Sequence, residues 1–228
     1  FFPSEEPMRH KDKETRMLYE EKRKELIETA RKMERYGLIR LSGGNVSLRL
    51  DDHVLVTPTA MSYDTMLPQD IVVLDLKGQV IDGKRRPTSD LKAILYILNH
   101  MDVNAVIHTH QPKALALSLV CDVLPMISAT MLEEVKGQVN VAPFTISSDE
   151  GMGIQTVEYA GDSLCVILKN HGVMAYGKDL DQALSAALYL EESCETYLLA
   201  LGTHKPITVL TQEQIEEEAK PRGYYGQP

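Results

Sequence analysis

The sequence predicts a single α/β domain with a partly antiparallel central sheet and helices on its faces. Strand-like segments occur in pairs joined by short turns, and a short connection joins antiparallel neighbours. Helix-like periodicity appears near both ends of the chain and in its middle, so helices can cover the sheet. There is no internal repeat, low-complexity tract or long linker in the 228 residues. We therefore predict one domain over residues 1–228, with residues 1–10 flexible and residues 220–228 a loop-like tail.

The strand predictions rest on alternating or continuously apolar runs bounded by turn residues. LSGGNVSLRL passes from a flexible turn into a strand, and Asp51–Asp52 form a hairpin turn before VLVTP. A second pair, IVVLDL and QVIDG, flanks Lys77–Gly78. Further strands are expected in NAVIHTH, VNVAPF and SLCVILKNHGVMAYG.

The helix predictions rest on apolar residues at helical spacing and on terminal signals. A charged amphipathic helix is expected over residues 11–36, with Gly37 as its C-terminal stop. Further helices are expected at 90–99, 112–119, 180–201 and 211–219. The last of these begins with TQEQ, a capping-box pattern.

Composition excludes several broad classes of protein. The net charge of −9 argues against a general nucleic-acid binder, which usually presents a basic face. No apolar run reaches the length of a membrane span, and the first ten residues lack the regions of a signal peptide. The three cysteines form no CxxC pair, which suits a reducing compartment. We expect a cytoplasmic protein without nucleic-acid or membrane partners.

Three histidines are candidate metal ligands. His108 and His110 end an apolar strand, and residues two apart in a strand point to the same side. His171 also follows an apolar strand and precedes Gly172, where the chain can turn sharply. Three neutral imidazoles with one open position are typical of a catalytic zinc site. The HxH spacing alone is equally compatible with a pair of ordinary surface or core histidines.

Three turns ahead of the HTH segment are suited to anion binding. GGNVS places two glycines before an amide and a hydroxyl, and TPTAMS and PTSD add more hydroxyls. PTSD precedes a helix, whose N-terminus can hold a phosphate. Each turn also has a purely structural interpretation, because GGNVS can be a hairpin turn and Thr88 or Ser89 a helix N-cap.

Taken in order, GGNVS, TPTAM, PTSD, NAVIHTH, KNHGVMAYGK and YYGQ resemble the class II aldolase/adducin family. The resemblance runs from about Ile27 to the C-terminus. It implies a three-layer α/β/α domain with a largely antiparallel sheet. It also implies a homotetramer with active sites between subunits, acting on a small phosphorylated sugar.

The resemblance assigns roles to individual residues. His108, His110 and His171 match the zinc ligands, although another divalent metal such as Mn²⁺ is possible. Asp90 matches an acidic residue that contacts the metal or moves a proton; its alternative interpretation is a helix cap. Tyr225 matches a tyrosine of a mobile C-terminal tail. The residues that match the phosphate-binding turns are Gly44 and Asn45, Thr59 and Ala60, and Thr88 and Ser89.

The subfamily markers conflict. Ala60 stands where the family usually has glycine, and Pro125 falls near the tyrosine of the fuculose-type aldolases. Glu133 is a loose match to an epimerase aspartate, whereas Gln214 replaces the epimerase histidine. We predict a zinc-dependent aldolase, a lyase that cleaves a C–C bond of a phosphorylated ketose through an enediolate. The alternatives are a ribulose-phosphate 4-epimerase, a sugar-acid decarboxylase and a non-catalytic adducin-like binding module.

Overall fold

The computed structural model describes residues 17–220. Its centre is a nine-stranded mixed sheet with the order β4-β3-β2-β1-β5-β9-β8-β7-β6. Every pairing is antiparallel except that of β7 with β8. The predicted α/β class with a largely antiparallel sheet is therefore confirmed. The predictions for residues 1–10 and for Tyr225 in the tail lie outside the described residues.

The strands follow the predicted apolar segments closely. They are β1 (Asn45–Leu50), β2 (His53–Val56), β3 (Val72–Asp75), β4 (Val80–Asp82), β5 (Ala105–Thr109), β6 (Val123–Leu124), β7 (Val139–Ala142), β8 (Cys165–Leu168) and β9 (Gly172–Gly177). The hairpin turn at Asp51–Asp52 and the β3–β4 pair are as predicted. Strand β6 has only two residues, which is too short for an alternating pattern of apolar and polar residues to be recognised in the sequence.

The helices are α1 (Glu20–Arg35), α2 (Leu91–His100), α3 (Pro112–Ser118), α4 (Ala129–Glu134), α5 (Gly151–Tyr159), α6 (Leu180–Leu201) and α7 (Gln212–Glu218). A one-turn 3₁₀ helix spans Pro68–Asp70. Gly37 has φ +77° and ends α1 as predicted, with Leu38 N–H bonded to the Met33 carbonyl. Thr211 and Gln214 form the predicted capping box of α7. Helices α4 and α5 were not predicted from the sequence.

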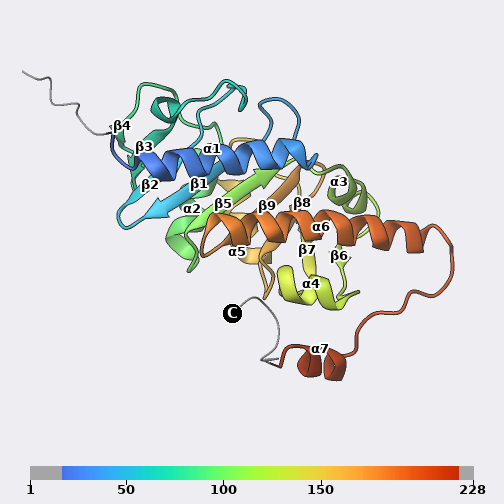
Figure 1. The fold of residues 1–228 in the computed structure, drawn as a ribbon. Helices are drawn as coiled ribbons and strands as arrows, with labels where there is room; N and C mark the ends of the chain where they lie inside the picture. Colours follow the sequence, from blue (N-terminus) through green and yellow to red (C-terminus); the bar gives the residue numbers. More distant parts are fainter. Residues whose placement is uncertain (1–16, 221–228) are drawn as a thin grey trace, which may run out of the picture.

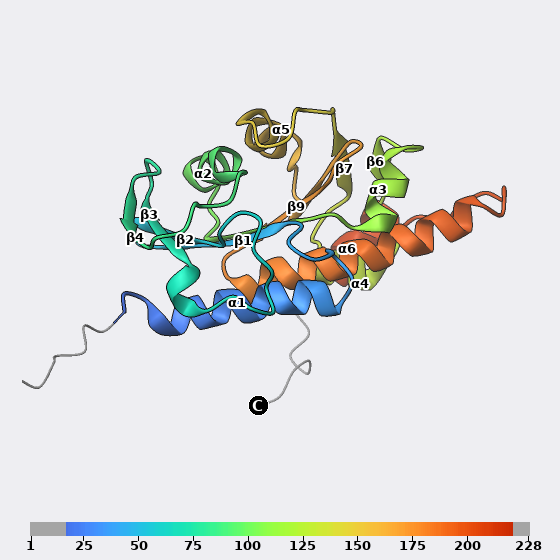
Figure 2. The ribbon, with the colours of Figure 1, turned by 90° about the horizontal axis from the view of Figure 1, so that it is seen from above.

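Two helical layers enclose the sheet (Figures 1 and 2). Helices α1 and α6 cover one face, and their apolar residues share a core with Val46, Ile107 and Ala175 of the strands. Helices α2 and α5 cover the other face, around Val106, Val166 and other strand residues of opposite parity. The predicted three-layer arrangement is therefore present, because each strand sends alternate side chains to the two layers.

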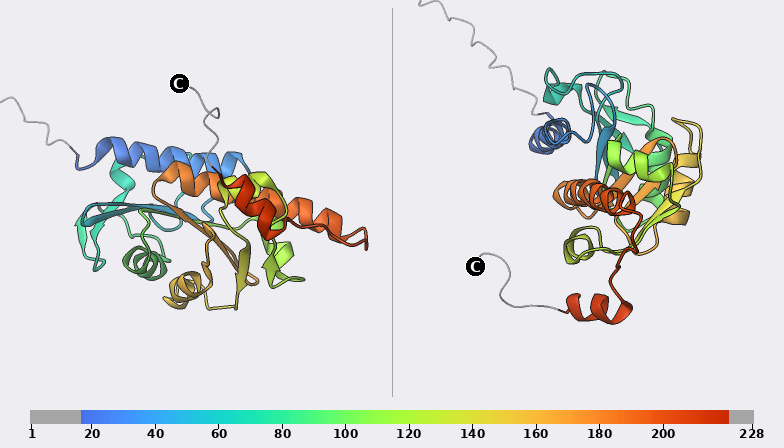
Figure 3. Two further views of the ribbon diagram at one scale, coloured as in Figure 1. Left: turned by 90° about the horizontal axis from the view of Figure 1, so that it is seen from below. Right: turned by 90° about the vertical axis from the view of Figure 1, so that its right-hand side faces the viewer.

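Helix α7 lies apart from the sheet, beyond α4 (Figure 3). It packs on α4, and the segment before it is held by a hydrogen bond from Leu210 N–H to the Met126 carbonyl. The chain therefore leaves the described region on the side of the molecule that α4 and α6 occupy. None of its helices is both long and apolar enough, over residues 17–220, to cross a membrane.

Candidate metal centre

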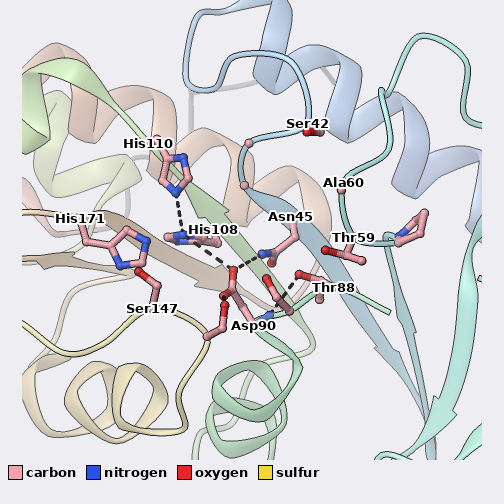
Figure 4. A pocket seen from close by; sticks show the side chains of 15 residues that line it. Ser42, Asn45, Thr59, Ala60, Thr88, Asp90, His108, His110, Ser147 and His171 are labelled. Atoms are coloured by element: carbon pink, nitrogen blue, oxygen red, sulfur yellow. Dashed lines mark hydrogen bonds and ion pairs between the residues drawn. The ribbon is translucent and has the colours of Figure 1, made fainter. Parts of the chain in front are cut away.

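A cavity of about 240 Å³ opens at the edge where β5 ends and α2 begins (Figure 4). Its lining brings together all three predicted metal ligands and all six residues of the predicted phosphate turns. Asp90 lies between these two groups. Segments that are far apart in the sequence thus meet in one pocket.

The three histidines converge on one point. Their ligand nitrogens all lie within 4.8 Å of one another. Nε2 of His108 is 3.1 Å from Nε2 of His110. Two nitrogens bound to one tetrahedral ion through bonds of about 2.0–2.1 Å lie roughly 3.3 Å apart, so this spacing suits a shared metal.

Neighbouring groups prepare the histidines for this role. Nδ1 of His108 donates a hydrogen bond to the Val173 carbonyl at 2.9 Å, which leaves Nε2 with its lone pair facing the other rings. Nδ1 of His171 is buried and has no hydrogen-bond partner in the described chain. A buried ring nitrogen without a partner is costly unless a bound group satisfies it.

Burial also favours the neutral form that a metal ligand requires. Desolvation lowers the pKa of His108 to about 4, with smaller contributions from the other two rings and an opposing one from Asp90. Burial is likewise the main cause that lowers the pKa of His110 and of His171. Because the rings stay neutral near pH 7, these residues fit a divalent metal.

Glycines allow the other segments to approach the ligands closely. A Cβ at Gly44 would lie 2.3 Å from the His108 carbonyl oxygen, and one at Gly172 would lie 2.2 Å from that of Thr109. Gly44 also has φ +71°, which disfavours other residues. Substitution at either position would push the loop away from the end of β5.

Asp90 is buried at the start of α2 but does not cap it with its side chain. Its Oδ2 accepts a hydrogen bond from the Asn45 amide at 2.7 Å and lies 4.0 Å from Nε2 of His108. Its Oδ1 accepts a hydrogen bond from the Ser148 hydroxyl at 3.2 Å. Asp90 therefore occupies the N-cap position of α2 without using its side chain as a cap. The Asp90 N–H donates to Thr88 Oγ1 at 3.3 Å.

The anion-binding side of the cavity offers unpaired donors. The backbone N–H groups of Gly44, Ala60 and Ser89 donate to no acceptor in residues 17–220, and neither does the Thr59 hydroxyl. By contrast, Thr59 N–H bonds to the Arg86 carbonyl and Thr88 N–H to the Thr57 carbonyl. Thr59 and Thr88 can therefore offer the cavity only their hydroxyls.

Three lining residues, Ser42, Ser147 and Ser148, lie outside the predicted motifs. Gly43 and Pro58 also line the cavity and belong to the predicted GGNVS and TPTAMS turns. Ser147 and Ser148 belong to the segment between β7 and α5, where Ser-Ser-Asp before a glycine was a turn signal. Glu133 lies exposed on α4 and does not line this cavity.

The fold is a three-layer α/β/α domain, and its cavity combines three histidines that could hold a metal ion with a carboxylate and unpaired donors. The chain belongs to the family described as the class II aldolase and adducin N-terminal domain, whose model matches residues 24–198.

Proteins of known sequence and structure agree with this assignment. A 5-deoxy-D-ribulose 1-phosphate aldolase of Bacillus thuringiensis is 30% identical over 92% of this chain and 100% of its own length. An L-fuculose phosphate aldolase of Methanococcus maripaludis is 38% identical over 66% of this chain and 82% of its own. The solved structure of an L-fuculose 1-phosphate aldolase superposes with a TM-score of 0.82 and 26% identity, covering 89% of this chain and 96% of that one.

Proposed function

We propose that this protein is a zinc-dependent class II aldolase that reversibly cleaves a small ketose phosphate. The observation that carries the proposal is the convergence of His108, His110 and His171 within 4.8 Å beside a carboxylate that is not used as a helix cap. The names of the relatives support sugar phosphates as the substrate class. Both named sugars are deoxy ketose phosphates, so a ketose 1-phosphate with a terminal methyl group is the first substrate to test.

Each part of the cavity has a task in this reaction. The unpaired N–H groups of Gly44, Ala60 and Ser89 bind the phosphate, which fixes the non-reacting end of the substrate. The three histidines hold the metal, which supplies Lewis-acid polarisation of the substrate carbonyl. Asn45 Oδ1 is buried without a partner among residues 17–220 and can accept a hydrogen bond from a substrate hydroxyl.

Proton transfer completes the assignment. Cleavage requires a base to remove the proton from the hydroxyl on the departing carbon, and an acid to protonate the carbon left behind. We assign the proton exchange to the Asp90 carboxylate, which faces the cavity. Tyr225 stays our prediction for the second proton-transfer group. Glu133 stays a prediction for an additional one, and because it does not line the cavity of its own chain it would have to act in the cavity of another subunit.

The test is a substrate panel with metal-loaded protein. We expect 5-deoxyribulose 1-phosphate or fuculose 1-phosphate to release dihydroxyacetone phosphate, and chelation to abolish the release until Zn²⁺ or Mn²⁺ is restored. The variant His110→Ala serves as the matched protein that neither binds metal nor cleaves. Fragment formation by that variant in the absence of bound metal would contradict the proposal.

The same panel separates the alternatives. A stereoisomer of ribulose 5-phosphate formed without net fragments would indicate an epimerase. Release of carbon dioxide from a keto sugar acid phosphate would indicate a decarboxylase. Absence of stoichiometric metal would favour an adducin-like binding module. Light scattering tests the proposed homotetramer, and fractionation of cells tests the proposed cytoplasmic location.

A further inference from the structure

The buried side chain of Tyr63 joins two of the turns that line the cavity. Tyr63 belongs to the segment between β2 and the 3₁₀ helix, and only 1% of it is exposed. Its hydroxyl donates a hydrogen bond of 2.8 Å to the carbonyl of Gly44 in the GGNVS turn. Burial raises the pKa of Tyr63 above its ordinary value of 10.0, so the hydroxyl stays protonated and remains a donor near neutral pH.

The Gly44 end of this hydrogen bond lies in a backbone that needs an external restraint. Gly44 has φ +71°, and glycine has more conformational freedom to lose than any other residue. On the other side of the unpaired Gly44 N–H, the Gly43 N–H donates to the Arg40 carbonyl at 2.9 Å. The peptide group that carries the Gly44 N–H is therefore held between two anchored neighbours, and the Tyr63 hydroxyl provides one of the anchors.

The Tyr63 end is anchored to helix α1. The Tyr63 carbonyl accepts a hydrogen bond from Nε of Arg31 at 3.0 Å. Nη2 of Arg31 donates to the carbonyls of Asp64 and Met66, both at 3.3 Å. Ala60, whose N–H is also unpaired within the described chain, lies three positions before Tyr63 on this anchored segment. One hydroxyl therefore links the two segments that carry the Gly44 and Ala60 donors.

We infer that Tyr63 is a positioning residue for phosphate binding, because it holds the N–H groups of Gly44 and Ala60 in one fixed arrangement. The inference rests on the proposed function, which assigns both N–H groups to the substrate phosphate. Tyr63 does not line the cavity, so it acts only through the turn that it restrains. Without its hydroxyl the glycine turn gains freedom, and ordering the turn around the anion costs part of the binding energy.

Tyr176 provides a matched control because it makes the same kind of hydrogen bond away from the cavity. It too is 1% exposed, and its hydroxyl donates to the Ser163 carbonyl at 3.0 Å on the α2/α5 side of the sheet. Neither Tyr176 nor Ser163 lines the cavity. Tyr63→Phe and Tyr176→Phe each remove one buried hydroxyl, so both should lower the melting temperature by about 2–4 °C. A purely structural role for Tyr63 predicts that the two variants behave alike in every assay.

Phosphate binding should separate the two variants. In Tyr63→Phe we expect KM for the phosphorylated ketose and the inhibition constant of inorganic phosphate to rise about 10-fold, the loss expected when one hydrogen bond to a charged group is weakened. Tyr176→Phe should keep wild-type values, and kcat and bound zinc should change little in both variants. NMR titration of the zinc-loaded proteins with inorganic phosphate gives the same comparison without turnover.

Three results would overturn the inference. Equal phosphate affinity in Tyr63→Phe and wild-type protein would show that the turn keeps its arrangement without the hydroxyl. An equal loss of affinity in Tyr176→Phe would assign the effect to general loosening of the fold. Absence of phosphate binding by the wild-type protein would leave Tyr63 no donors to position. If the wild-type protein binds phosphate but cleaves no sugar phosphate, the proposed aldolase reaction fails, whereas the titration still decides the role of Tyr63.

Discussion

Two buried carboxylates stand at helix starts in this protein, and they behave differently. Glu191 of α6 accepts the backbone N–H groups of Lys113 and Ala114 at 3.0 and 3.1 Å, at the first turn of α3. Asp90 precedes α2 directly but bonds to the side chains of Asn45 and Ser148 instead. The Glu191 carboxylate accepts hydrogen bonds from free backbone N–H groups of the helix it faces, whereas the Asp90 carboxylate faces a cavity.

The difference supports our proposal that Asp90 serves the reaction, whereas Glu191 serves folding. A side-chain cap stabilises a helix start by about 0.5–2 kcal/mol. The protein forgoes that contribution at Asp90, whose side chain makes no capping hydrogen bond. A residue type suited to capping that is directed elsewhere is evidence of a function outside folding.

The largest expected effect follows from substituting the carboxylate at α2. Asp90→Asn should lower kcat by roughly 10²–10⁴-fold, the usual contribution of a general base. Thermal stability and metal content should change little, because Asp90 neither caps α2 nor belongs to the ligand group. Steady-state kinetics, thermal denaturation and metal analysis measure the three quantities. A variant that lost its metal would show Asp90 to be a ligand.

Glu191→Gln should lower stability and leave kcat unchanged, the opposite of what is expected for Asp90→Asn. One of the two N–H groups at the start of α3 loses its acceptor, so the free energy of unfolding should fall by about 1–2 kcal/mol. Turnover by the folded protein should be unchanged. Urea denaturation monitored by circular dichroism, followed by an activity assay, checks both. A large loss of kcat at full stability would mean that the two carboxylates are not separable in this way.

The histidines that face Asp90 predict a pH dependence. Burial lowers the pKa of His108 from 6.5 to about 4, so the ring stays neutral as the pH falls through 6.5. Metal should be retained through pH 6.5 and released as the pH approaches about 4, where protons compete for the ring. Competition with a coloured chelator measures the affinity at each pH. Replacing the exposed His204 with Gln should leave the profile unaltered.

In metal-free protein, the lowered pKa of His108 should also make the free energy of unfolding depend on pH. At the His108 ring, the unfolded state binds more protons than the folded state between pH 6.5 and about 4. The contribution to the free energy of unfolding is therefore present above pH 6.5 and lost as the pH falls through that window. Urea denaturation after chelation should detect the loss, and a flat profile would contradict a neutral buried His108.

The smallest effect is expected at Ala60, which lines the same cavity as Asp90. Ala60 has φ +53°, a conformation that costs an L-residue roughly 1–2 kcal/mol. Ala60→Gly relieves that strain but adds flexibility to the unfolded chain, so we expect a gain of about 1 kcal/mol or less. Thermal denaturation checks the gain. A decrease would mean that the methyl group contributes packing that outweighs the strain.

Elements with strong local signals could be predicted from the sequence. Helix α6 has the predicted bounds 180–201, because it combines long apolar periodicity with Asp179 as its N-cap. Helices α3 and α7 are similarly short but were predicted, because α3 has a proline in its first turn and α7 a capping box. Helices α4 and α5 carry neither signal and were missed. Short elements of this kind depend on packing for their stability more than on local propensity.

In the candidate site, too, some features could be predicted from the sequence and others depended on the tertiary structure. The HxH spacing on a strand predicted that His108 and His110 face one side, since the two-residue period of a strand requires it. The unpaired nitrogen of His171, the hydrogen bond from Ser148 and the use of Asp90 away from its own helix were decided only by the tertiary structure. The contacts of Asp90 with Asn45 and with Ser148, and that of His108 with His171, join residues 45 to 63 positions apart in the sequence. No local sequence pattern encodes contacts between segments that are so far apart. The sequence by itself determined which chemical groups the protein carries and which way each strand presents them; the packing of α2 and the β7–α5 loop against β1 and β5 determined which of them share a cavity.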